Sequence, residues 1–173
     1  KLSDQDRSQF LQPGGSRDVE WKGKLTSGAC TVLSLEASKK VLRETPDRVL
    51  TSRFLDKWKQ LDDSTIPKSR WVIHGFKDPD IFDLSRTAPT PSTSSVYSAM
   101  QVCASNNWPT AIGDISMAFD QSDKSTRSKP LYASVPADYG LPGVPPGCII
   151  QLNTEIYGLL TGPWWFRRSL VRY

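Results

Sequence analysis

The chain has 173 residues, which is enough for one ordinary domain, and 38% of them are hydrophobic, so a buried core can form. Three widely spaced cysteines and one histidine argue against a disulfide framework and against a zinc site, and no apolar run has the length of a membrane-spanning helix. The net charge is +4, and ten basic but only five acidic residues lie between positions 39 and 77. This block is expected to face phosphates, or else to be an ordinary solvated surface.

Helices are expected in residues 1–47, which we predict to be a loosely organised N-terminal lead-in. Ser34 has the side chain of a good N-cap for a helix that runs to about residue 43. The spacing of Leu35 and Leu42 predicts that both face inward, while the lysines between them face solvent.

A basic hairpin is expected in the next segment, residues 48–91. Residues 46–60 place Val, Leu, Phe and Trp among charges and predict a strand, and the Asp-Asp-Ser sequence at 62–64 predicts a turn. The β-branched and aromatic run at 70–76 predicts the partner strand. The rest of the segment is predicted to be a connection with little regular structure.

The last segment, residues 92–173, alternates between helical and strand-like patterns. We predict a helix, three short strands and a final helix in the order 92–106, 111–116, 131–135, 148–152 and 163–172. The proline at position 163 suits the first turn of the final helix. Residues 121–129 are polar, and we expect them to form a mobile loop.

Asp114 is the first candidate site residue, because it lies near the end of the predicted strand 111–116. Polymerases transfer a nucleotidyl group with two divalent ions, and Mg²⁺ takes oxygen ligands from one or two carboxylates together with substrate phosphates. The small residues around Asp114 would let triphosphate oxygens approach the backbone, and Phe119 would then lie against the sugar. An aspartate that ends a strand beside small residues is more often an ordinary turn residue, and both interpretations stay open.

Five segments of the chain, in this order, resemble motifs of the copia-type reverse transcriptases of retrotransposons. They are Lys68–Phe76, Asp114–Phe119, Tyr132–Pro136, Cys148–Leu152 and Ile156–Pro163. The resemblance covers about residues 48–173. The chain has Ser92 and Leu160 where the family has Arg and Lys, and these departures would suit a divergent or decaying element.

The resemblance implies an α/β (α+β) fold made of the fingers and part of the palm of a right-hand polymerase, with a mixed sheet and packed helices. Residues 48–91 would belong to the fingers, and residues 92–173 to a partial palm whose first catalytic aspartate lies on a strand. The implied activity is RNA-directed DNA polymerase by two-metal nucleotidyl transfer. Its cofactor would be Mg²⁺, and its partners would be an RNA or DNA template-primer and deoxynucleoside triphosphates.

By the same resemblance, Asp114 would be the catalytic residue and would bind Mg²⁺, while Phe119 would exclude the 2′-hydroxyl of ribonucleotides. Lys68 and Arg70 would hold the triphosphate, for which an ammonium and a guanidinium fork are suited. Without the family, these two residues are simply part of a basic hairpin in water. Three further residues would line the nucleotide site, namely Ile115, Tyr157 and Gly158.

The final helix carries a second basic patch. Arg167 and Arg168 are placed to contact a nucleic-acid backbone. The three aromatic residues at 164–166 could stack on bases, but at least two of them are expected to be core residues.

The chain ends soon after the last motif, so the pair of adjacent aspartates that completes such a site has no place in it. We therefore expect an inactive fragment of a retrotransposon Pol polyprotein, which would be an intracellular protein of the cytoplasm or nucleus with no membrane partner. Two other classes stay open. One is a non-catalytic nucleic-acid-binding relic of such an element, and the other is a structural domain whose resemblance is accidental.

Overall fold

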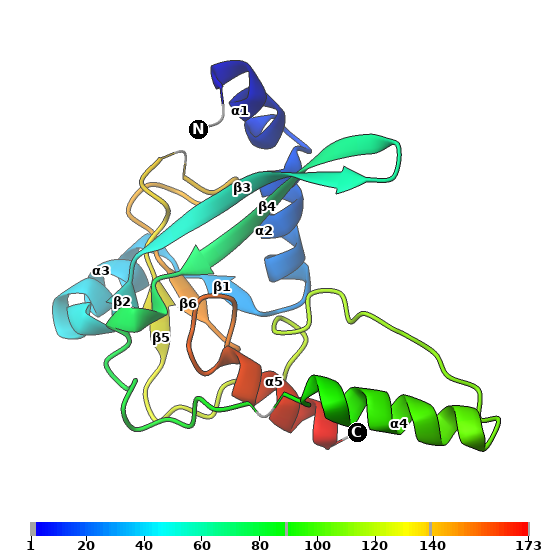
Figure 1. The fold of residues 1–173 in the computed structure, drawn as a ribbon. Helices are drawn as coiled ribbons and strands as arrows, with labels where there is room; N and C mark the ends of the chain where they lie inside the picture. The colour runs from blue at the N-terminus through cyan, green and yellow to red at the C-terminus, as the bar shows by residue number, and fades with distance from the viewer. Residues whose placement is uncertain (1–2, 89, 139, 173) are drawn as a thin grey trace.

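The computed structural model describes residues 3–88, 90–138 and 140–172, and it combines helices with two β-sheets (Figure 1). The helices are α1 (Asp4–Leu11), α2 (Ser16–Thr26), α3 (Leu35–Glu44), α4 (Thr93–Ser105) and α5 (Gly162–Val171), with short 3-10 helices η1 (Pro46–Arg48) and η2 (Gly75–Lys77). The strands are β1 (Cys30–Val32), β2 (Val49–Leu50), β3 (Ser52–Leu61), β4 (Ser64–Ile73), β5 (Leu131–Ala133) and β6 (Ile150–Leu152). The predicted α+β class is confirmed.

The larger sheet is mixed and has the strand order β1-β6-β5-β2. Strand β6 pairs antiparallel with both β1 and β5, whereas β2 pairs parallel with β5. Its strands are short, but their apolar side chains are buried in one continuous core with the base of the hairpin. The sheet draws strands from all three predicted segments, so residues 1–47, 48–91 and 92–173 share this core.

Strands β3 and β4 form the predicted hairpin, which projects from the sheet in Figure 1. Their register runs from the pair of Ser52 with Ile73 to the pair of Leu61 with Ser64, so the turn lies at Asp62 and Asp63 as predicted. One face of the hairpin packs on the lead-in helices. Trp71 is fully buried there and meets Trp21 of α2 edge-on, with ring centroids 5.4 Å apart.

Two helices have less apolar contact than their sequences predict. Helix α3 begins after its Ser34 cap as expected, but Leu35 and Leu42 are both exposed. The buried residue of α3 is Ser38, whose hydroxyl oxygen accepts a hydrogen bond from the backbone N–H of Ile149. Helix α4 extends away from the rest of the molecule in Figure 1, and none of its described residues is buried.

The predicted strand 111–116 is wrong. Residues 111–115 have no regular secondary structure and are exposed, and the side chain of Ile112 is 98% exposed. A strand needs a partner for its backbone N–H and C=O groups, and the larger sheet ends at β1 and β2 without one at this segment. Gly113 in the middle of the segment weakens its strand propensity further.

Candidate functional site

Three of the predicted site residues come together around the ring of Tyr157. Phe119 meets this ring edge-on with centroids 4.6 Å apart, and the guanidinium carbon of Arg70 lies 5.5 Å from its centroid. The ammonium nitrogen of Lys24 lies 5.1 Å from the same centroid. Phe166 of α5 supports Phe119 from behind at 5.9 Å. The cluster therefore joins the hairpin, the turn before residue 121, the turn before α5, and α2.

Gly158, also a predicted site residue, makes a close backbone approach to the hairpin. The Tyr157 carbonyl accepts a hydrogen bond of 3.0 Å from the N–H of Ile73. Gly158 has φ +98°, and a Cβ added to it would lie 2.0 Å from the Ile73 carbonyl oxygen. A Cβ added to Gly75 would in turn lie 2.2 Å from the Gly158 oxygen. These two glycines let the turn after Ile156 seat directly on the end of β4.

The predicted Mg²⁺ ligand lies outside this cluster. Asp114 is exposed on the irregular segment 111–115, five positions before Phe119, and Ile115 beside it is exposed as well. In the described part of the chain, no group of three or more His, Cys, Asp or Glu side chains is arranged to hold a metal ion. A single exposed carboxylate does not fit a Mg²⁺ site by itself. We therefore assign no metal-dependent step to these residues.

The outer face of the hairpin carries positive charge. Residues directly opposite each other in an antiparallel pair share a face, and side chains alternate along each strand. The register pairs Lys57 with Lys68 and Leu55 with Arg70, so all the odd-numbered cations of β3 lie on the face of Lys68 and Arg70. Five exposed cations share this face: Arg53, Lys57, Lys59, Lys68 and Arg70. Lys68 also lines a groove beside α2 together with Met117, two residues before Phe119.

The basic patch of α5 is exposed as predicted, and its aromatic neighbours are mostly packed. Arg167 and Arg168 are both exposed, and the Arg168 guanidinium carbon lies 5.3 Å from the ring centroid of Trp165. Trp165 is buried and donates its indole N–H to the Asp123 carbonyl at 2.7 Å. Trp164 and Phe166 are half-buried.

Sequence reasoning missed a buried group of charges beneath the Tyr157 cluster. The ammonium of Lys24 contacts both carboxylate oxygens of Asp120, at 2.9 and 2.7 Å, and a Glu20 oxygen at 3.2 Å. The side chains of Lys24 and Asp120 are 0% exposed. Burial raises the pKa of Asp120 above its usual value, and the charge of Lys24 opposes this shift. The i, i+4 spacing of Glu20 and Lys24 is visible in the sequence, but nothing local indicates a partner 96 residues away.

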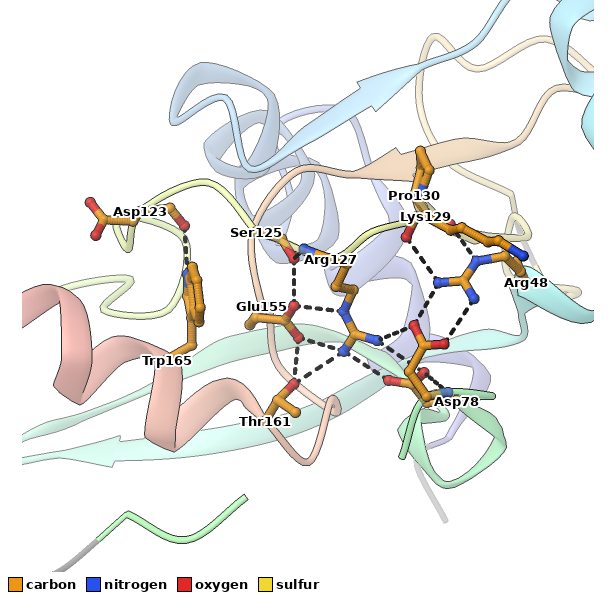
Figure 2. A network of polar contacts seen from close by, with 11 residues as sticks. Arg48, Asp78, Asp123, Ser125, Arg127, Lys129, Pro130, Glu155, Thr161 and Trp165 are labelled. Carbon is orange, nitrogen blue, oxygen red and sulfur yellow. Dashed lines mark hydrogen bonds and ion pairs between the residues drawn. The ribbon is translucent and has the colours of Figure 1, made fainter. Parts of the chain in front are cut away.

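It also missed the polar network around Arg127, which Figure 2 shows. Arg127 lies in the segment expected to be mobile, and that prediction is wrong, because the side chain is buried between carboxylates of separate segments. Its guanidinium donates to Glu155 at 2.7 and 2.8 Å and to Asp78 at 3.0 Å. Arg48 completes the network by binding Asp80 at 2.6 Å and the carbonyls before β5. The network joins the end of η2, the loop before β5 and the turn before α5.

Two carboxylates of this network, those of Glu155 and Asp80, have pKa values lowered by their arginine partners. Burial alone would raise the pKa of Glu155, but the hydrogen bonds and charge of Arg127, with hydrogen bonds from Thr161 and Ser125, hold it below its usual value. The hydrogen bond and charge of Arg48 likewise lower the pKa of Asp80. Each buried carboxylate of the network thus has an arginine partner within the network. We therefore interpret the network as structural.

No helix in the described residues is both long and apolar enough to cross a membrane. Searches with protein-family models, against curated proteins and against solved structures found no match to this chain.

Proposed function

We propose that this chain is the nucleotide-binding and nucleic-acid-binding part of an RNA-directed DNA polymerase of the copia type, within a retrotransposon Pol polyprotein. The observation that carries the proposal is the cluster at Tyr157. Arg70, Phe119 and Tyr157 come from three motifs that are far apart in the sequence, and their side chains meet. The coincidence of three motif residues in one place supports a common ligand.

The chemistry of the cluster suits a deoxynucleoside triphosphate. Arg70 is exposed and offers a planar fork of donors to phosphate oxygens. Phe119 presents an aromatic edge that would pack against a deoxyribose and would clash with a 2′-hydroxyl. The other cations of the outer hairpin face would bind the phosphates of a template strand.

In the intact polymerase that we propose, Asp114 would join further carboxylates in holding Mg²⁺. The partners would be the template-primer and the remainder of the polyprotein, in the cytoplasm or nucleus of the cell. For this chain by itself the proposal concerns binding alone, since one exposed carboxylate does not make a metal site.

The test is equilibrium binding of a deoxynucleoside triphosphate to the purified chain. Arg70→Ala should weaken binding at least about tenfold, because it removes a charge-assisted contact. Arg53→Ala is the matched control, since Arg53 is an exposed arginine on the same face of the hairpin and lies opposite Val72. Equal effects of the two substitutions, or no binding by the wild-type chain, would refute a nucleotide site at Tyr157.

A non-catalytic nucleic-acid-binding module is the second candidate. It is favoured by the five cations on the outer hairpin face and by the place of Asp114, which is exposed in a segment without regular secondary structure. It predicts binding of single-stranded oligonucleotides without any triphosphate site. If all five cations contact phosphates, the logarithm of the association constant should fall against the logarithm of salt with a slope of about −3.5. A salt-independent affinity would exclude this candidate.

A further inference from the structure

We propose that Lys24 and Asp120 are positioning residues that fix Phe119 and Arg70 against the Tyr157 ring and thereby set the discrimination between deoxyribo- and ribonucleotides. This inference rests on the proposed nucleotide site. It concerns residues outside the motifs that suggested that site, and neither residue needs to touch the nucleotide.

The buried charges connect the two halves of the cluster. Asp120 directly follows Phe119, and both of its carboxylate oxygens contact Lys24. Lys24 also contacts Glu20, one turn earlier in α2. The same Glu20 oxygen accepts a hydrogen bond of 3.3 Å from the backbone N–H of Trp71. A chain of polar contacts therefore runs from the neighbour of Phe119 to the neighbour of Arg70.

Helix α2 holds the turn of Phe119 at two adjacent positions. Met117 has φ +52°, and its side chain packs so closely on Gly23 that an added Cβ there would lie 2.7 Å from the methionine methyl group. The Met117 carbonyl accepts the N–H of Asp120 at 2.9 Å. Contacts through Gly23 and Lys24 thus fix the orientation of the turn, and the ring of Phe119 is directed onto Tyr157.

A stable core does not need a buried ion pair. Burying two charges costs desolvation free energy, and apolar side chains of similar size often stabilise a core as well or better. What a buried pair supplies in addition is a defined geometry, since an ammonium between two carboxylates has few alternative positions. A ring that excludes a single 2′-hydroxyl group needs a well-defined position, because a displacement of the ring by about 1 Å would open space for that hydroxyl group.

The test uses a variant that removes both charges of the pair with little change of volume, Lys24→Met combined with Asp120→Asn. The matched control is Lys22→Met, because Lys22 lies on the same helix and pairs with an aspartate at i−4, but its side chain is 68% exposed. Two quantities are measured in each folded protein. One is the ratio of dissociation constants for a ribonucleoside and a deoxynucleoside triphosphate, and the other is the NMR nuclear Overhauser effect between the rings of Phe119 and Tyr157.

We expect the double variant to unfold at a lower temperature than the wild type, because the Glu20 carboxylate loses the ammonium that contacts it at 3.2 Å. The folded double variant should lose most of the ring-to-ring signal and about tenfold in discrimination. The control should keep both. A folded double variant with the signal and the ratio of the wild type would overturn the proposal and leave the pair a purely structural role. Asp120→Asn alone, which keeps the shape of the side chain, provides the same comparison if the double variant does not fold.

The ring-to-ring signal needs no ligand, so it separates this proposal from the proposed function. If the wild-type chain binds no triphosphate but the double variant loses the signal, the nucleotide site is refuted while the positioning of Phe119 by Lys24 and Asp120 stands.

Discussion

Replacing Arg127 with methionine should destabilise the whole chain, because one guanidinium holds together carboxylates from separate segments. It donates to both oxygens of Glu155, at 2.7 and 2.8 Å, and lies 2.8 Å from an oxygen of Asp78. Methionine keeps an unbranched side chain of comparable length, so the substitution removes the charge and the hydrogen bonds with little change in packed volume.

The magnitude follows from burial. The side chains of Asp78 and Glu155 are only 3% and 4% exposed, so water cannot replace the lost guanidinium easily. Removing one partner of a buried ion pair costs about 3–5 kcal/mol. Ser125 and Thr161 still donate to Glu155 after the substitution, which places the expected loss at the lower end, about 3 kcal/mol. Domains of this kind have a total stability of about 5–15 kcal/mol, so the loss should be large in any assay.

The assay is urea unfolding followed by tryptophan fluorescence, for which the six tryptophans of the chain provide the signal. The matched control is Arg167→Met, which removes an arginine that is exposed on α5 and should change the free energy of unfolding by no more than about 0.5 kcal/mol. A loss below about 1 kcal/mol for Arg127→Met would refute the reasoning, because it would mean that the two carboxylates reach water or protons without cost.

Three further predictions follow from individual residues. Gly158→Ala should cost at least about 2 kcal/mol of stability, since its φ is +98° and its Cβ would lie 2.0 Å from a carbonyl oxygen, whereas Gly113→Ala has open space and should be nearly neutral in the same urea assay. Because the folded-state pKa of Glu155 lies below its ordinary value of 4.5, its ionisation adds stability above pH 4.5 that is lost as pH falls through the folded pKa. The difference in unfolding free energy between wild type and Glu155→Gln should therefore shrink on acidification, and a constant difference would contradict the shift. Iodoacetamide should label Cys103 well before Cys30 in the native protein, because burial raises the pKa of the Cys30 thiol to about 12. Peptide mapping by mass spectrometry gives the order of labelling, and labelling of Cys30 first would contradict its burial.

The hairpin and the helix ends could be predicted from the sequence because their signals are local. Two acidic residues between β-branched and aromatic runs fixed the turn and thus the register of β3 with β4. Ser34 accepts a backbone N–H group of the first turn of α3, as predicted, and Ser92 does the same for α4. In each case, the residue types of a few neighbouring positions are enough to predict the turn or the helix start.

The missed features depend on distant partners. The isoleucines around Asp114 have the composition of a strand, but no sheet edge receives them. Lys24 and Arg127 look like surface residues in any local window, and only the fold brings them to buried carboxylates. The contact of Arg70 with Tyr157 likewise joins distant segments, and neither residue shows a local signal for the other.

The distribution of charge explains why a net charge of +4 understates the field of this protein. Asp56 is the sole acidic residue within β3 and β4, and it points to the inner face, where it binds Arg17 of α2 at 2.6 Å and is 9% exposed. The one acid of the two strands is thus neutralised by a cation from outside the hairpin, and the other acids of the hairpin, Asp62 and Asp63, lie at its turn. The cations of Arg53, Lys57, Lys59, Lys68 and Arg70 stay on the outer face, where the two strands place no carboxylate. A polyanion that approaches this face meets five positive charges, one of which, Arg70, lies on the Tyr157 ring, and this supports the nucleic-acid binding that we propose.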